Sequence, residues 1–271
     1  MVRVVLSNRE GNTVSSPPYA AGQSERFSTD ELRELNGRFE KTEPLEIIRW
    51  AAEAFGAAGV GGGGLVMTSS FGADSMCTVH LATRVIPDIP IVLINTGYLF
   101  AETIRFMEEM RSRFNLNVRE YHTHNDPIVW LSVNGETDPR VRNNRDACCA
   151  ANKNSVMDRA MKELSPTAWI RGVRGDQTED RAKSEIVQWF PRYNAWAVSP
   201  ILRWTSRDVF QYMKKHDLPH HPLWEKGYVS IGCNPATCTR PITAGEDERA
   251  GRWAGSDKKE CGINLDMGSN I

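Results

Sequence analysis

Cysteines carry the most reactive side chains in this chain, and they fall into groups with different chemistry. Cys148 and Cys149 are adjacent, Cys233 and Cys238 form a second pair in a turn that contains Gly and Pro, and Cys261 stands alone near the end. Four thiolates that converge from two segments can hold a zinc ion or an iron–sulfur cluster. Neighbouring cysteine side chains diverge, which suits two corners of a cube better than one ion. We therefore predict one 4Fe-4S cluster per chain on the four paired cysteines; zinc, or two buried and two accidental cysteines, are the alternatives.

Cys261 is the candidate nucleophile. It follows Lys258 and Lys259 in a terminal segment punctuated by glycines. Cations lower the pKa of a thiol and glycines let a chain move, so this thiolate can reach a substrate and later a second protein. The alternative is a free surface cysteine on a frayed terminus. Cys77, between Met76 and Val79 in a predicted helix, is interpreted as core packing.

A polar turn that follows a predicted strand is the candidate anion site. Residues 65–70 form a short apolar run that ends in hydroxyls, and a helical pattern resumes after the turn. A strand, a Gly-containing turn and a helix in this order present backbone N–H groups and a helix N-terminus to phosphate or sulfate. An ordinary capped turn is the alternative. The predicted cradle comprises Ser69, Ser70, Phe71, Gly72, Ala73, Asp74 and Ser75.

Two further polar turns follow predicted strands. The apolar run 89–94 ends at Thr96 and Gly97, and the strand predicted at 167–171 is followed by a loop with Arg174 and Arg181. Arginines at that place suit forked contacts to phosphate or sulfonate oxygens. The alternative is a solvated charged loop.

The elements that must position these residues alternate between strand and helix. Helical spacing predicts helices at 28–39 and 43–58, with Ser28 in a capping box, and further helices at 103–114, 154–164 and 205–216. Strands are predicted at 65–70, 89–94, 116–121 and 167–171, with a hairpin at 186–190 and 195–198. This order indicates an α/β fold with a parallel twisted sheet and helices on both faces, where ligands bind at the carboxyl ends of the strands. Residues 126–145 are predicted to be irregular.

Composition limits the class of protein and its partners. The chain has 271 residues, 40% hydrophobic and 25% charged, and a formal net charge of −1. This balance gives no reason to expect nucleic acid or an anionic membrane as a partner. There is no run long enough to span a bilayer and no apolar secretory core, so we expect a cytoplasmic protein. The alternative is an organellar transit segment, because residues 1–27 are rich in Ser and poor in acidic residues. We expect a loose arm at 1–27, one domain at 28–245 and a mobile tail at 246–271; the sequence leaves a homo-oligomer open.

These motifs together resemble the assimilatory phosphoadenylyl-sulfate and adenylyl-sulfate reductases. The resemblance runs from about residue 45 to 265. Its motifs are Ser69-Ser70-Phe71-Gly72-Ala73 (a modified PP-loop), 95–100 with Glu102 and Thr103, 172–174 through Gln177 to Arg181, 221–224, 227–232 and Glu260-Cys261-Gly262.

The resemblance implies an adenine nucleotide alpha hydrolase-like fold with a nucleotide over the PP-loop. It implies that the Cys261 thiolate attacks the activated sulfate, that an S-sulfocysteine forms, and that thioredoxin or glutaredoxin releases sulfite from it. The cations expected to neutralise sulfate and phosphate oxygens are Lys153, Arg174, Arg181 and Arg240.

The double cysteine with a second pair is similar to the cluster-bearing branch, which is associated with adenylyl sulfate as substrate. We therefore expect reduction of adenylyl sulfate to sulfite and AMP, with the 3′-phosphorylated nucleotide, phosphoadenylyl sulfate, as the alternative. Two features depart from the family. Four residues separate Cys233 from Cys238 where two are usual, and Ile263-Asn264 replaces the Leu-His that usually follows Gly.

Two other functions are open at this stage. An ATP pyrophosphatase such as the sulfate adenylyltransferase small subunit shares the fold, but 71–75 lacks the double glycine that admits pyrophosphate. A non-catalytic sensor with a cluster and a nucleotide pocket has no need of Glu260-Cys261-Gly262.

Overall fold

The fold is known from a computed structural model that describes residues 26–56, 63–133, 145–234 and 238–264. The expected N-terminal arm therefore lies almost entirely outside the described residues. The helices are α1 (Thr29–Phe39), α2 (Pro44–Phe55), α3 (Ala73–Thr83), α4 (Ala101–Arg113), α5 (Pro127–Val133), α6 (Arg145–Cys149), α7 (Ser155–Leu164), α8 (Glu179–Ala182) and α9 (Ser206–Lys215). The strands are β1 (Leu65–Thr68), β2 (Ile91–Asn95), β3 (Val118–His122), β4 (Ala168–Arg171), β5 (Val187–Phe190) and β6 (Ala195–Val198).

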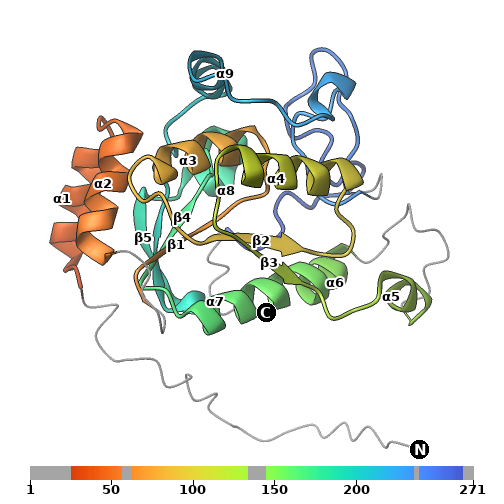
Figure 1. The fold of residues 1–271 in the computed structure, drawn as a ribbon, viewed down its shortest axis with the longest axis horizontal. Coiled ribbons are helices and arrows are strands. Elements are labelled where there is room, and N and C mark those ends of the chain that lie inside the picture. The colour runs from red at the N-terminus through yellow and green to blue at the C-terminus, as the bar shows by residue number, and fades with distance from the viewer. Residues whose placement is uncertain (1–25, 57–62, 134–144, 235–237, 265–271) are drawn as a thin grey trace, which may run out of the picture.

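The strands form one sheet in the order β3-β2-β1-β4-β6-β5. All neighbours are parallel except β5 and β6, which pair antiparallel as the predicted hairpin. The predicted α/β architecture is confirmed. Helices cover both faces of the sheet, with α3, α4 and α9 on one side and α6 and α7 on the other (Figure 1).

Alternate residues of β1 face different hydrophobic layers. Leu65 and Met67 belong to the large core with α1 to α4, whereas Val66 belongs to a second core with α7. Each is almost fully buried. A strand covered on both faces has to be apolar throughout, which explains why the parallel strands read as continuous apolar runs.

Helix starts follow the capping signals. The Ser28 hydroxyl accepts from the Glu31 amide while the Glu31 carboxylate accepts from the Ser28 amide, and Thr205 forms the same capping box with Asp208 before α9. The prediction that 126–145 is irregular is wrong for 127–133, which forms α5, and residues 134–144 lie outside the described residues. A Pro at the first turn fits a helix start and is easily mistaken for a loop signal.

Candidate active site

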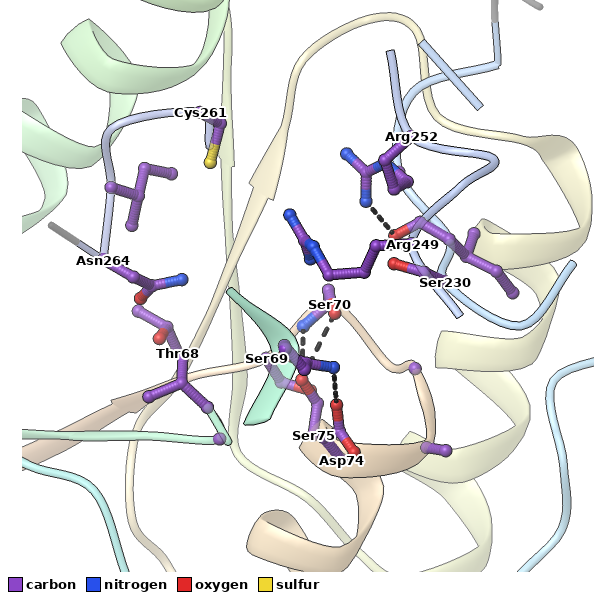
Figure 2. A pocket seen from close by; sticks show the side chains of 18 of the residues that line it. Thr68, Ser69, Ser70, Asp74, Ser75, Ser230, Arg249, Arg252, Cys261 and Asn264 are labelled. Carbon is purple, nitrogen blue, oxygen red and sulfur yellow. Dashed lines mark hydrogen bonds between the residues drawn. The ribbon is translucent and has the colours of Figure 1, made fainter. Parts of the chain in front are cut away.

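A cavity of about 450 Å³ opens at the carboxyl ends of β1, β2 and β4. Figure 2 shows Cys261 and Asn264 on one side of it, Ser230, Arg249 and Arg252 on the other, and the polar residues of the first turn below. Its size is typical of a site for a nucleotide-sized ligand. The sequence-predicted residues that line it are Ser69, Ser70, Gly72, Ala73, Asp74, Ser75, Thr96, Lys153, Arg174, Arg181, Cys233 and Cys261.

The turn after β1 is held by its own hydroxyls. The Ser70 and Ser75 hydroxyl oxygens are 3.2 Å apart, and the Ser69 hydroxyl accepts from the Phe71 amide at 3.1 Å. Phe71 does not line the cavity; its side chain is fully buried in the core and its φ is +57°. A left-handed φ is unusual for a bulky residue, and the buried ring fixes this turn with Ser70 and Gly72 toward the cavity.

Cys261 lies inside the cavity wall with only 8% of its surface exposed. Burial works against the thiolate, but the Lys153 ammonium and the Ile263 backbone N–H oppose it, and the pKa of Cys261 lies below its ordinary value. The sequence suggested Lys258 and Lys259 as the source of this effect. Lys258 instead pairs with Asp146, so the activating cation comes from the π-helical turn Ala150–Asn154 and not from the terminal segment.

Arg174 and Arg181 line the cavity but are bonded to carboxylates. Arg174 is 2% exposed and donates to Asp74 at 2.9 Å, to Asp176 at 2.8 and 2.9 Å, and to Glu248. Arg181 donates to both carboxylate oxygens of Glu260, at 2.6 and 3.0 Å, and to the Gln177 side chain. Every nitrogen of both guanidiniums is therefore engaged within the protein.

Besides Phe71, two predicted substrate residues lie outside the cavity wall. Arg240 does not line it and pairs with Glu246 at 2.7 Å, a carboxylate six residues further along the chain. Gly97 also lies outside, and its backbone N–H donates to the Asn95 side chain. The expectation that these residues contact the ligand gains no support from their positions.

The four paired cysteines meet in a second, small cavity beside the first. Thr96 and Cys233 are 3.4 Å apart between Oγ1 and Sγ, and Asn152 donates to the Cys148 sulfur at 3.6 Å. Burial raises the pKa of Cys149 to about 12, and the nearby Lys153 opposes that rise. Convergence of four thiols on one cavity fits the donor set of an iron–sulfur cluster. In the described ranges, however, no group of three or more His, Cys, Asp or Glu side chains is arranged to hold a metal ion. The cluster therefore stays a prediction.

Cys77 behaves as predicted from its position. It is fully buried in α3, and burial raises the pKa of its thiol far above the ordinary value. It packs with Val209 and Met213 of α9, so it is a core residue and has no place in the chemistry of the cavity.

Sequence reasoning missed two cations that line the cavity, Arg249 and Arg252. Arg252 donates to the backbone oxygens of Cys238 at 3.2 Å and Ile231 at 3.1 Å. The acceptors of these two hydrogen bonds are backbone carbonyl groups and not carboxylates. The Arg252 guanidinium lies against the backbone of Gly232, where an added Cβ would be 2.3 Å from it. A larger residue before Cys233 would therefore require this arginine side chain to shift.

Comparison with known proteins identifies the family. The family model for the phosphoadenosine phosphosulfate reductase domain matches residues 64–241. The chain belongs to this family. Two relatives are named phosphoadenosine 5′-phosphosulfate reductase: one from a Synechococcus species is 41% identical over 86% of this chain and 97% of its own length, and one from Xylella fastidiosa is 38% identical over 87% and 94%.

Solved structures share the fold of this family member. A phosphoadenylyl-sulfate reductase from Candida auris, in complex with phosphate, matches with a TM-score of 0.63 at 20% identity, over 76% of this chain and 96% of its own. An FMN adenylyltransferase from Candida glabrata matches with a TM-score of 0.54 at 14% identity, over 88% and 80%. The fold is that of the adenine nucleotide alpha hydrolase-like proteins, as the resemblance implied. In the part of the chain that the structure describes, no helix is long and apolar enough to cross a membrane.

Proposed function

We propose that this family member reduces phosphoadenylyl sulfate to sulfite, with Cys261 as the nucleophile. The observation that carries the proposal is the meeting of four features in one cavity: the Cys261 thiol, the hydroxyls of the first turn, the N-terminus of α3 and the cations Lys153, Arg249 and Arg252. A thiol with a lowered pKa beside an anion-binding turn is arranged for attack on a nucleotide-bound sulfonate.

In the first step the Cys261 thiolate attacks the sulfur of the sulfonate. A bond forms between the two sulfur atoms, the bond from that sulfur to the bridging phosphate oxygen breaks, and the nucleotide leaves as adenosine 3′,5′-bisphosphate. Negative charge develops on the departing phosphate oxygen. Lys153 and Arg252 lie in the cavity wall, where low dielectric strengthens their attraction for such charge.

In the second step a dithiol protein of the thioredoxin or glutaredoxin class supplies two electrons. One of its thiolates attacks the Cys261 sulfur, and sulfite leaves with the electron pair of the broken bond. Its second thiol then resolves the mixed disulfide, which restores the Cys261 thiol and leaves the dithiol oxidised. Because Cys261 is only 8% exposed, the second step requires the terminal segment to move outward.

Adenylyl sulfate is the second candidate substrate. The names of the relatives favour the 3′-phosphorylated nucleotide, which the sequence analysis kept as its alternative. The convergence of four cysteines on one cavity favours adenylyl sulfate, through the association of the cluster-bearing branch with that nucleotide. The two substrates differ only in the 3′-phosphate, so the choice depends on a cation that receives it.

A 4Fe-4S cluster is part of the proposal. Cys148, Cys149, Cys233 and Cys238 would hold it, next to Lys153 in the wall between the two cavities. When bound, such a cluster would add its charge and its capacity for electron transfer to the site. Neither proposed step on Cys261 requires the cluster as a reactant.

A direct assay tests the proposed function. Anaerobically purified protein is given phosphoadenylyl sulfate or adenylyl sulfate with thioredoxin, and sulfite and the released nucleotide are measured. We expect sulfite with the higher kcat/KM for phosphoadenylyl sulfate. A higher kcat/KM for adenylyl sulfate would select the second candidate, and absence of sulfite from both would refute the function. Pyrophosphate release from ATP and sulfate would instead indicate the pyrophosphatase chemistry.

A further inference from the structure

Three arginines from one short stretch hold residues 246–264 in place. We call residues 171–181 the docking segment and residues 246–264 the catalytic segment. Arg174 donates to Glu248, Arg181 to Glu260, and Arg171 to the backbone oxygen of Asn264 at 2.5 Å. The contacts are spaced along the catalytic segment and bracket Cys261.

The contact beside the nucleophile has the strongest geometry. Arg181 and Glu260 form a two-pronged pair, with 2.6 Å between Nε and Oε1 and 3.0 Å between Nη2 and Oε2. The Thr178 hydroxyl donates to the same carboxylate at 3.2 Å, and Arg249 lies 3.5 Å from it. Both side chains of the pair are below 10% exposed, at 9% and 6%. Such a pair fixes orientation as well as distance.

The pair acts on Cys261 through the backbone. Glu260 is the preceding residue, so its Cα lies about 3.8 Å from that of Cys261. On the other side, Gly262 has a φ of +88° and its backbone lies against Asn154, where an added Cβ would be 3.0 Å from Nδ2. With Asn264 also held by Arg171, the thiol sits on a short stretch anchored at both ends.

We propose that Arg181 is a positioning residue that sets the place of the Cys261 thiol through Glu260, and that it does not bind the sulfate or phosphate of the substrate. The inference deepens the proposed function and rests on Cys261 being the nucleophile. A near-attack geometry is sensitive to small displacements, and a misplacement of about 1 Å can cost about 100-fold in rate.

The observed bonds argue against the anion-binding role that the sequence suggested for Arg181. Its three guanidinium nitrogens are engaged with Glu260 and Gln177. A substrate anion would have to displace a carboxylate that is itself almost fully buried. Without Arg181, the buried Glu260 carboxylate would keep only the Thr178 hydroxyl and the more distant Arg249 as partners, which is unfavourable for a buried charge. Arg252, which bonds only to backbone oxygens in the contacts above, is the better anion ligand.

The test compares Glu260→Gln, Arg181→Gln and the double variant with the wild type. Glu246→Gln is the matched control, because Glu246 belongs to the same segment and also pairs with an arginine, Arg240, outside the cavity wall. Arg181→Lys keeps the charge without the fork and serves if the glutamine variants fold poorly. Far-UV circular dichroism and thermal melting establish that each variant is folded.

Two readouts separate positioning from substrate binding. We expect each single variant, and Arg181→Lys, to lower the kcat of sulfite release by at least tenfold, with the KM for the nucleotide within about threefold of the wild type. The double variant should be no worse than either single one, because both lose the same contact. The proposal would be overturned if Arg181→Gln raised the KM while Glu260→Gln left it unchanged. It would also be overturned if the losses of kcat in the two single variants multiplied in the double variant.

The second readout needs no turnover. In the absence of nucleotide, iodoacetamide should alkylate Cys261 at least about tenfold faster in the single variants than in the wild type or Glu246→Gln, because the released segment opens more often. Equal alkylation rates would contradict the proposal. If the wild type releases no sulfite from either nucleotide, the proposed function fails, while the alkylation rates still decide whether Arg181 holds the segment.

Discussion

At the scale of single residues, the proposed chemistry depends on one thiol, Cys261, whose pKa is lowered by a lysine more than a hundred residues away in the sequence. The pKa of Cys261 is lowered against the effect of burial, chiefly by Lys153. The two residues are far apart in the sequence and meet only in the folded protein. Burial disfavours the charged form of Lys153 as well, but the neighbouring thiols Cys261 and Cys233 raise its pKa. Each charge therefore stabilises the other inside the wall.

Replacement of the nucleophile should stop the reaction before sulfite forms. Cys261→Ser removes the only described thiol that lines the cavity from the catalytic segment, and we expect sulfite release to fall by about a thousandfold or more. Nucleotide binding, measured by calorimetry, should persist. Intact mass of the wild type with substrate and no reductant should show one added sulfonate on Cys261. A mass increase on another residue, or unchanged turnover in the variant, would remove Cys261 from the mechanism.

Replacement of Lys153 should raise the pKa of the thiol. Lys153→Met removes the main charge that favours the thiolate, so the pH at which Cys261 becomes half alkylatable should move upward. The alkylation rate at pH 7 should fall accordingly, with iodoacetamide as reagent and peptide mass spectrometry to assign the site. Lys259→Met is the control, because Lys259 is not among the largest influences on the pKa of Cys261. An equal effect in both variants would assign the activation to general surface charge.

At the scale of elements, a buried histidine between a loop and a helix should make the stability of the fold depend on pH. His221 is 5% exposed; the Leu223 backbone N–H donates to its Nδ1 at 3.2 Å, and its Nε2 lies 3.0 Å from the Thr103 hydroxyl of α4. Burial lowers the pKa of His221 to about 4. The ring is therefore neutral in the fold, with Nε2 as the protonated nitrogen.

Acid should weaken the fold through this histidine. The unfolded chain binds the proton more readily than the folded one, so stability is complete above the ordinary histidine pKa of about 6.5 and declines as pH falls toward 4. At pH 5 the loss should be about 2 kcal/mol, by the linkage of about 1.4 kcal/mol per pKa unit. Urea unfolding at pH 7 and pH 5 measures it. His221→Gln should lose this part of the dependence, whereas exposed His124→Gln should keep it; equal slopes would refute the assignment.

The elements themselves were largely predictable, while the partners of the arginines were not. Apolar runs of strand length and the capping boxes at Ser28 and Thr205 are local signals, and each produced the expected element. Arg174 and Arg181 were correctly placed at the cavity. Their partners Glu248 and Glu260 lie more than seventy residues away along the chain, at separations of 74 and 79, so no local pattern links them. Lys153 was named as a cation, but its action on Cys261 is likewise a matter of tertiary contact.

At the scale of the whole molecule, the cavity is lined by two different parts of the chain, the α/β sheet with its helices and the segment 246–264. The sheet and its helices supply the polar turn 69–75. The catalytic segment 246–264 contains no helix or strand, and it joins the rest by ion pairs and one isolated bridge between Thr239 and Arg252. Trp253, 3% exposed, is its main apolar anchor. Cys261 and Ile263 are buried in the same core, but a segment with so few backbone hydrogen bonds and so small an apolar contact is at the low-stability end of a fold.

The catalytic segment should therefore open without unfolding of the sheet. We expect its backbone amides to exchange hydrogen at least tenfold faster than those of β1, β2 and β4. The exchange rate should depend only weakly on denaturant, because opening of the segment exposes little apolar surface. Hydrogen exchange with mass spectrometry, over low urea concentrations, measures both. Opening of this kind is what a protein thiol needs to reach Cys261, which is almost fully covered in the closed arrangement. Exchange as slow as that of β4, with the same dependence on urea, would mean that the segment leaves only when the whole domain unfolds, and the second step would then need another route to the sulfur.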